Sequence, residues 1–149
     1  MSNADPPYVQ LLERYCLAVF TQKLDDLMAL YADDITVFDP FNDWSIHGIA
    51  AWRASMQQWF DGMGEGRVGV RYTKPHATIV QYSLVLHTTL SFFEFDAHAK
   101  QVRSIANRCT MAARRDLDDW QIFHQHCSLP VAEASLQAIT QPATPLVFA

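Results

Sequence analysis

The chain has 149 residues, half of them hydrophobic, and a formal net charge of −5. This length is typical of one domain with a substantial core. The negative charge, without a cluster of Lys and Arg, argues against a nucleic-acid-binding surface. No apolar stretch reaches the length of a membrane span. We therefore expect a soluble domain with no nucleic-acid partner and no membrane partner.

Cys16, Cys109 and Cys127 lie far apart in the sequence and show no C-x-x-C spacing. Free cysteines of this kind are typical of reduced intracellular proteins, where they pack as small hydrophobic residues. The first residues also lack the basic and apolar segments of a signal peptide. The expected location is the cytoplasm.

Three helices are predicted in the first half of the chain. Asp5, followed by two prolines, is expected to cap a first amphipathic helix that ends at about residue 20. A short second helix is predicted at 24–31 and ends at two aspartates, before a strand at 35–39. A loop then leads to Gly48, which opens the third helix.

Three glycines, Gly62, Gly64 and Gly66, predict a flexible connection after the third helix. From there the pattern changes to period two with many β-branched residues, which is typical of strands. The predicted strands cover residues 67–73, 77–82, 84–95, 101–115 and 119–128.

Helices followed by consecutive strands with short turns indicate an α+β domain. We expect a long, curved antiparallel β-sheet with the three N-terminal helices on its concave face. This domain covers residues 1–130, and residues 131–149 form a C-terminal tail.

The most informative residue is Asp39, at the end of the strand predicted at 35–39. Ile35, Val37 and Asp39 alternate and therefore project from one face of that strand. A carboxylate on an apolar face is partly desolvated, which raises its pKa and favours a role as general base. The alternative is a simple Asp-Pro turn, in which the carboxylate accepts backbone N–H bonds.

Several segments of the chain resemble a known superfamily. The early segments are similar to bacterial ketosteroid isomerases, which belong to the NTF2-like group together with SnoaL-like polyketide cyclases. They are Glu13-Arg14-Tyr15, Leu24-Asp25-Asp26-Leu27, Ala29 to Asp34 and Val37 to Pro40. The segment from Arg114 to Ser128 resembles SnoaL-like proteins of unknown function and the association domain of calmodulin-dependent kinase II. The resemblance implies an NTF2-like, cystatin-like cone around an apolar pocket.

The isomerase resemblance also implies roles for three residues. Asp39 falls at the position of the general base, and Tyr15 at that of a tyrosine that donates a hydrogen bond to the dienolate oxygen. Thr110 falls where the isomerases have a protonated aspartic acid. Because a threonine hydroxyl is a weaker acid, steroid isomerisation itself is not implied. Tyr15 also has an alternative role in core packing.

Other residues are expected to line the pocket. Counting along the last two strands places Arg108 on the pocket face, two residues from Thr110. Its guanidinium is then expected to pair with Asp39, with Glu94 or with an anionic ligand. The alternative is that Arg108 lies at the mouth of the pocket, with its charged end in water. The same count places Cys127 on this face. The candidate walls are Trp44, Trp52, Met56, Trp59, Phe60, Phe92 and Phe123, although such an aromatic stripe also suits a core.

His124 and His126 have the spacing of two ligands on one strand, but no third metal ligand has a recognisable spacing. We expect no metal and no cofactor. The count places both histidines on the convex face, where they are expected to form a homodimer interface.

Together these features favour an enzyme that moves a proton beside a carbonyl group of a hydrophobic small molecule, as an isomerase, cyclase or dehydratase without a cofactor. The alternative is a domain of the same fold that binds a small ligand or mediates oligomerisation without catalysis.

Overall fold

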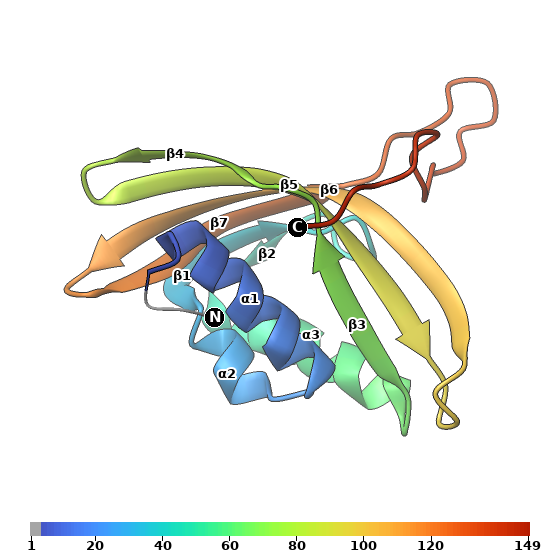
Figure 1. The fold of residues 1–149 in the computed structure, drawn as a ribbon. Coiled ribbons are helices and arrows are strands. Elements are labelled where there is room, and N and C mark those ends of the chain that lie inside the picture. Colours follow the sequence, from blue (N-terminus) through green and yellow to red (C-terminus); the bar gives the residue numbers. More distant parts are fainter. Residues whose placement is uncertain (1–3) are drawn as a thin grey trace.

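The structure is a computed structural model that describes residues 4–149. Within this range there are three helices, α1 (Pro7–Phe20), α2 (Leu24–Met28) and α3 (Ile49–Met63). The strands are β1 (Tyr31–Phe38), β2 (Ile46–His47), β3 (Arg67–Tyr72), β4 (His76–Val80), β5 (Ser83–Phe95), β6 (Gln101–Asp116) and β7 (Asp119–Ser128). The sheet curves around the helices, which lie on its concave side (Figure 1). The predicted α+β architecture is confirmed.

The strands form one sheet in the order β2-β1-β7-β6-β5-β3, and β4 pairs with β5. Neighbouring strands run antiparallel except β1 and β7, which pair in parallel. Phe38, the last residue of β1, lies opposite His126 of β7. The segment that follows β1 therefore starts beside the end of β7, near the middle of the sheet.

Helix α1 forms because its apolar residues recur at helical spacing and bury one face against the sheet. Its buried residues are Leu11, Leu12, Tyr15, Ala18 and Val19. The predicted cap at Asp5 is wrong by one residue, because Pro6 occupies the N-cap position and no side chain caps this end. Pro7 follows at the first helical position, which suits proline, since its fixed φ favours the first turn and it lacks an N–H that would need a partner.

The second helix is shorter than predicted. It ends at Met28, and β1 already begins at Tyr31, so Asp33 and Asp34 lie within the strand rather than at a helix end. The pairing of β1 with β7 shifts register between Tyr31 and Thr36, and this bulge leaves both aspartates exposed. Asp34 then forms an ion pair with Arg114 at 2.6 Å.

Helix α3 begins after Gly48, as predicted, and buries Trp52, Met56 and Phe60. Gly62 lies inside this helix, so only residues 64–66 form the connection to β3. Gly66 is needed there, because a Cβ at this position would lie 2.7 Å from the backbone oxygen of Phe95. This close approach joins β3 to the end of β5.

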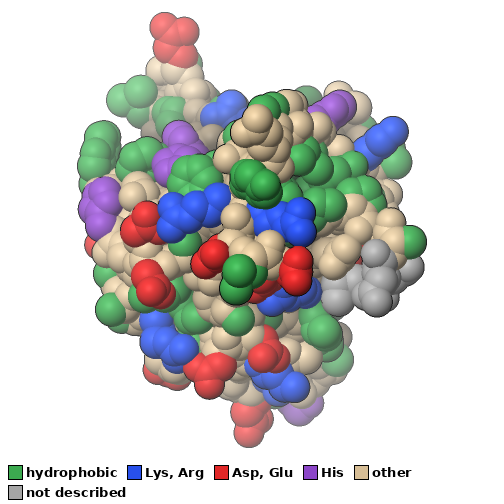
Figure 2. Space-filling model, turned by 90° about the vertical axis from the view of Figure 1, so that its left-hand side faces the viewer, with side chains coloured by type: hydrophobic (Ala, Val, Ile, Leu, Met, Phe, Trp, Pro, Cys, Tyr) green, Lys and Arg blue, Asp and Glu red, His purple; other side chains and the backbone are tan. Residues whose placement is uncertain are grey.

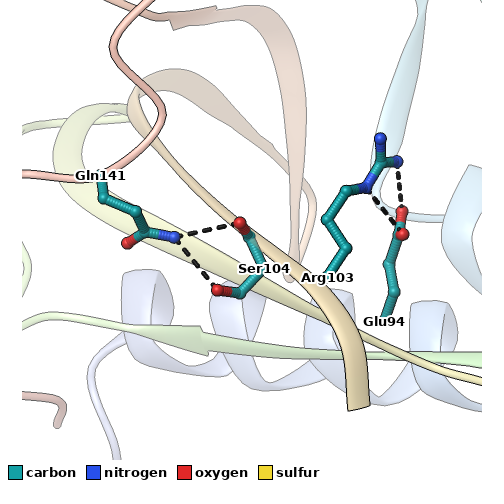
Figure 3. A network of polar contacts seen from close by, with 4 residues as sticks. All are labelled: Glu94, Arg103, Ser104 and Gln141. Atoms are coloured by element: carbon teal, nitrogen blue, oxygen red, sulfur yellow. Dashed lines mark hydrogen bonds and ion pairs between the residues drawn. The ribbon is translucent and has the colours of Figure 1, made fainter.

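The tail of residues 131–149 is attached to the body at two places. The Thr140 oxygen accepts a 2.9 Å hydrogen bond from the Ala106 N–H, and Gln141 Nε2 donates to Ser104 (Figure 3). Further on, Phe148 forms a bridge with Thr73. The tail thereby pairs with parts of the sheet that other strands leave free.

Acidic and basic side chains are interspersed on the face that carries the β6–β7 turn (Figure 2). Arg14 lies 3.7 Å from Asp119, and Arg115 lies 3.3 Å from Asp118. This face therefore has no large patch of one sign. In the described part of the chain, no helix combines the length and the apolar character needed to cross a membrane.

Candidate active site

The concave side of the sheet encloses a cavity of about 820 Å³ between the sheet and the helices. Its apolar walls come mainly from α3 and β5, through Trp52, Met56, Trp59 and Phe92. Trp59 and Phe92 meet edge to face, with ring centroids 6.1 Å apart. The rest of the lining includes polar and charged side chains, among them Asp39, Glu94 and Arg103. A cavity of this size, with an apolar wall and several polar groups, suits a small, partly hydrophobic ligand.

Asp39 lies in the wall of this cavity, one residue beyond β1. Ile35 and Val37 are fully buried, and Asp39 continues their face of the strand. Burial raises the pKa of Asp39 from 3.8 to about 6; a weak hydrogen bond from the Phe41 N–H opposes this rise, and the nearby charge of Asp43 adds to it. Asp39 is therefore a carboxylate that titrates close to neutral pH, as the sequence predicted.

Tyr15 reaches the same cavity from α1. Its side chain is 4% exposed, and its hydroxyl makes no hydrogen bond to any residue of the described range 4–149. Burial raises the pKa of Tyr15 well above 10, and nearby ionisable groups, including Asp39, raise it further. Tyr15 thus keeps its proton and has an O–H to donate.

A second tyrosine supports the floor of the cavity. Tyr31 donates a 2.7 Å hydrogen bond to Gln125 Oε1, and Gln125 Nε2 lies 3.8 Å from the Cys127 sulfur. A hydrogen bond with Cys109 and burial raise the pKa of the Cys127 thiol well above its usual range. Cys127 therefore lines the cavity as a neutral, apolar group, and an ionised nucleophile is not expected there.

An ion pair lies at the mouth of the cavity. Glu94 of β5 and Arg103 of β6 face each other across the two strands and form two hydrogen bonds, of 2.6 and 2.8 Å (Figure 3). The sequence named Glu94 only as a possible partner of Arg108, and Arg103 was not predicted. Arg103 occupies the role at the mouth that the sequence analysis assigned to Arg108.

Seven of the predicted site residues lie together around the cavity: Tyr15, Asp39, Trp52, Met56, Trp59, Phe92 and Cys127. Trp44 does not, because the loop after β1 projects it into solvent, where it is 96% exposed. Phe60 is buried in the core beside Trp59.

The predicted positions of Arg108, Thr110 and Phe123 are wrong, and one β-bulge explains all three. Ala112 pairs with His124 and Ala113 with Ile122, so Phe123 is an extra residue without a partner. When residues of β6 are paired with β7 by counting from the turn, one extra residue shifts the pairing by one. Every β6 residue beyond the bulge is then assigned to the wrong face of the sheet. Phe123 consequently packs under Arg114, with the guanidinium 5.4 Å from the ring centre.

Beyond the bulge, the pocket face of β6 carries Asn107, Cys109 and Met111 instead of Arg108 and Thr110. Thr110 pairs with His126, and Arg108 pairs with Ser128, to which its Nε donates a 3.2 Å hydrogen bond. These four residues line a shallow depression on the convex face. The alternation in β6 contained the missed signal, because Cys109, Met111 and Ala113 are apolar while their neighbours Arg108, Thr110 and Arg114 are polar.

Within residues 4–149, no group of three or more His, Cys, Asp or Glu side chains is arranged to hold a metal ion. His124 and His126, which have the spacing of two ligands on one strand, contact an aromatic ring instead: Phe38 packs edge-on against both, with ring centroids 5.3 Å away in each case.

The sequence of residues 9–132 matches the SnoaL-like domain family. The chain belongs to this family. No curated protein matches the chain in sequence. The SnoaL-like fold is shared with an NTF2-like protein of unknown function from Pseudomonas putida, which is 23% identical with a TM-score of 0.80 over 92% of this chain and 94% of that one.

Two further solved structures share the fold of this SnoaL-like chain. A proposed dehydratase of the NTF2-like family from Streptomyces avermitilis is 14% identical, with a TM-score of 0.71 over 85% of this chain and 95% of that one. A proposed association domain of a calcium/calmodulin-dependent protein kinase type II from Thiobacillus denitrificans is 22% identical, with a TM-score of 0.64 over 85% and 98% of the two chains. At these identities, the similarities establish the NTF2-like fold.

Proposed function

We propose that this SnoaL-like protein is an enzyme that transfers a proton beside the carbonyl group of a hydrophobic small molecule. The observation that carries the proposal is Asp39, a largely buried carboxylate with a pKa of about 6 in the wall of a cavity that also has an apolar wall. Such a carboxylate is mostly ionised at neutral pH, yet it is a stronger base than an ordinary aspartate. It is therefore suited to remove a weakly acidic C–H proton.

The proposed first step uses two side chains. Asp39 accepts a proton from the carbon next to the carbonyl, and the electron pair of that C–H bond shifts to form an enolate. Tyr15 donates its O–H to the enolate oxygen, where the negative charge develops. The hydroxyl of Tyr15 is available for this because no described residue engages it.

The second step depends on the substrate. In an isomerisation, the substrate carries a C=C bond conjugated with the enolate, and protonated Asp39 returns its proton to the far carbon of this dienolate, which shifts the double bond. In a dehydration, the enolate electrons expel a hydroxyl group from the next carbon, and this group takes the proton from Asp39 and leaves as water. The structural similarity to the proposed Streptomyces dehydratase supports the second course.

Exchange of hydrogen for deuterium tests the proton transfer without knowledge of the natural substrate. The probe is β-tetralone, a bicyclic ketone with acidic C–H groups beside its carbonyl, in D₂O and observed by NMR. We expect wild-type protein to accelerate the exchange and Asp39→Asn to lose roughly a hundredfold or more of that acceleration. Asp33→Asn is the matched control, because it makes the same change at an aspartate of the preceding strand β1 that is exposed. Equal exchange rates for wild type and Asp39→Asn would remove Asp39 from the role of base.

A second candidate function is ligand binding or assembly without catalysis, which the similarity to the proposed kinase association domain favours. We propose that two copies of the chain pair through the convex face around His124 and His126. Sedimentation of wild type and His126→Glu tests this, because a charge in the contact should shift a dimer to monomer. A wild-type monomer at high protein concentration argues against the pairing.

A further inference from the structure

A buried amide on the cavity wall lacks a hydrogen-bond partner. Asn107 lies on the concave face of β6 opposite Leu90 of β5, and its side chain is 6% exposed. Among the described residues, none provides a partner for its Oδ1, which is enclosed by protein atoms, or for its Nδ2. Buried polar groups in proteins are nearly always hydrogen-bonded, so an exception at a cavity indicates a partner outside the chain.

Gln125 provides a comparison within the same cavity wall. It is a buried amide on the neighbouring strand, 2% exposed, and its Oε1 accepts the hydrogen bond of Tyr31. The chain thus provides a partner for one of two buried amides that line the cavity. Of these two amides, only Asn107 lacks a partner within the described chain.

Asn107 lies well away from Asp39, the proposed base. Asp39 follows Phe38, which pairs with His126, so Asp39 is level with Cys127 and with Cys109, the partner of Cys127. Asn107 is two strands across from Asp39 and two residues along β6 from Cys109. Strand spacing and rise place the two backbones roughly 12 Å apart. Because both side chains project from the same face of the sheet, about this distance also separates their polar atoms, which leaves room for two fused six-membered rings with a contact at each end.

We propose that Asn107 determines substrate specificity by hydrogen-bonding a hydroxyl group at the end of the substrate remote from the reacting carbonyl. This inference rests on the proposed function, since Asp39 and Tyr15 fix the other end of the substrate. The substrate class is then a flat carbonyl compound of bicyclic length with a distal hydroxyl. Only one end of the amide is open to the cavity, since Oδ1 is enclosed and Nδ2 is not. A hydroxyl fits because it both donates and accepts, and can therefore bond whichever end a half-turn of the side chain presents to the cavity.

Three bicyclic ketones test the proposal by isothermal titration calorimetry. They are β-tetralone, its derivative with a hydroxyl at the far end of the aromatic ring, and the derivative with a methyl group in place of that hydroxyl. Wild-type protein is expected to bind the hydroxyl compound roughly two- to twelvefold more tightly than the methyl compound, the effect of one net hydrogen bond. Asn107→Leu, which replaces the amide by an apolar group of similar size, is expected to abolish or reverse this preference. Asn107→Ser, which keeps a hydrogen-bonding group, should retain part of it.

Ser91→Ala is the matched control, because Ser91 Oγ also lacks a partner and is buried. Ser91 pairs with Ala106 on the other face of the sheet, so its removal should leave the preference unchanged. Equal binding of the hydroxyl and methyl compounds by wild type, or a preference that survives in Asn107→Leu, overturns the proposal. So does the absence of binding of all three, because the inferred length then fails.

Deuterium exchange separates this inference from the proposed function. If wild type prefers the hydroxyl compound but catalyses no exchange, Asn107 binds the hydroxyl and the proton-transfer proposal fails. If exchange depends on Asp39 but the preference is absent, the function stands and the role of Asn107 is overturned.

Discussion

Replacement of Asp39 by Asn is expected to stabilise the protein at neutral pH while it removes the proposed base. Burial raises the pKa of Asp39 from 3.8 in its ordinary state to about 6 in the folded protein. At pH values between 3.8 and about 6, Asp39 is protonated in the folded protein but ionised in the unfolded chain. The free energy of unfolding therefore falls as the pH rises through this window, and it stays lowered above about pH 6.

The size of the effect follows from the difference between the two pKa values. About two pKa units correspond to roughly 3 kcal/mol, and the partial exposure of the carboxylate reduces this to about 2 kcal/mol. Asparagine has no charge to desolvate, so Asp39→Asn should gain this amount above about pH 6. For a chain of this length, the melting temperature should rise by about 4–8 °C.

Urea unfolding of wild type and Asp39→Asn over a pH series measures the difference directly. We expect no difference below about pH 3, where Asp39 is protonated in both the folded and the unfolded state, and the full gain at neutral pH. Asp33→Asn again serves as the control and should show little gain at any pH, because Asp33 is exposed. A gain that is equal at all pH values, or a loss of stability at neutral pH, would refute the reasoning from burial.

Three further substitutions test the remaining parts of the site. Tyr15→Phe should slow β-tetralone exchange by roughly tenfold or more, and normal exchange would exclude Tyr15 as the donor. The urea midpoint of this variant should be nearly unchanged, since the Tyr15 hydroxyl has no partner in the described chain. Tyr31→Phe should cost about 1–3 kcal/mol in urea unfolding, because it leaves Gln125 Oε1 buried without its donor; an unchanged midpoint would contradict that bond. Asn107→Leu should raise the free energy of unfolding by about 1 kcal/mol, and a marked loss of stability would indicate that the amide has a partner within the protein.

Much of the fold could be predicted because the second half of the chain follows simple period-two patterns. The strands predicted at 84–95 and 119–128 differ from β5 and β7 by one residue at most. The raised pKa of Asp39 was also predictable, since it depends on the alternation of Ile35, Val37 and Asp39 in one strand. Both predictions use local sequence, which fixes the direction of side chains in a regular strand.

The rest of the site depends on pairing between strands, which local sequence does not determine. Arg108 and Thr110 were placed by counting through the β6–β7 turn, and the bulge at Phe123 breaks that count. The cross-strand pair of Glu94 and Arg103 likewise depends on the register of β5 with β6. Asn107 was missed for the same reason, because the count placed it on the convex face.

The pH dependence of β-tetralone exchange tests the central claim most directly. A general base with the pKa of Asp39 predicts that the catalysed rate rises with pH, reaches half its maximum near about pH 6 and then stays constant. Asp39→Asn should show no such rise. A wild-type profile that is flat across this range, or a rise that persists in Asp39→Asn, would contradict proton transfer by Asp39.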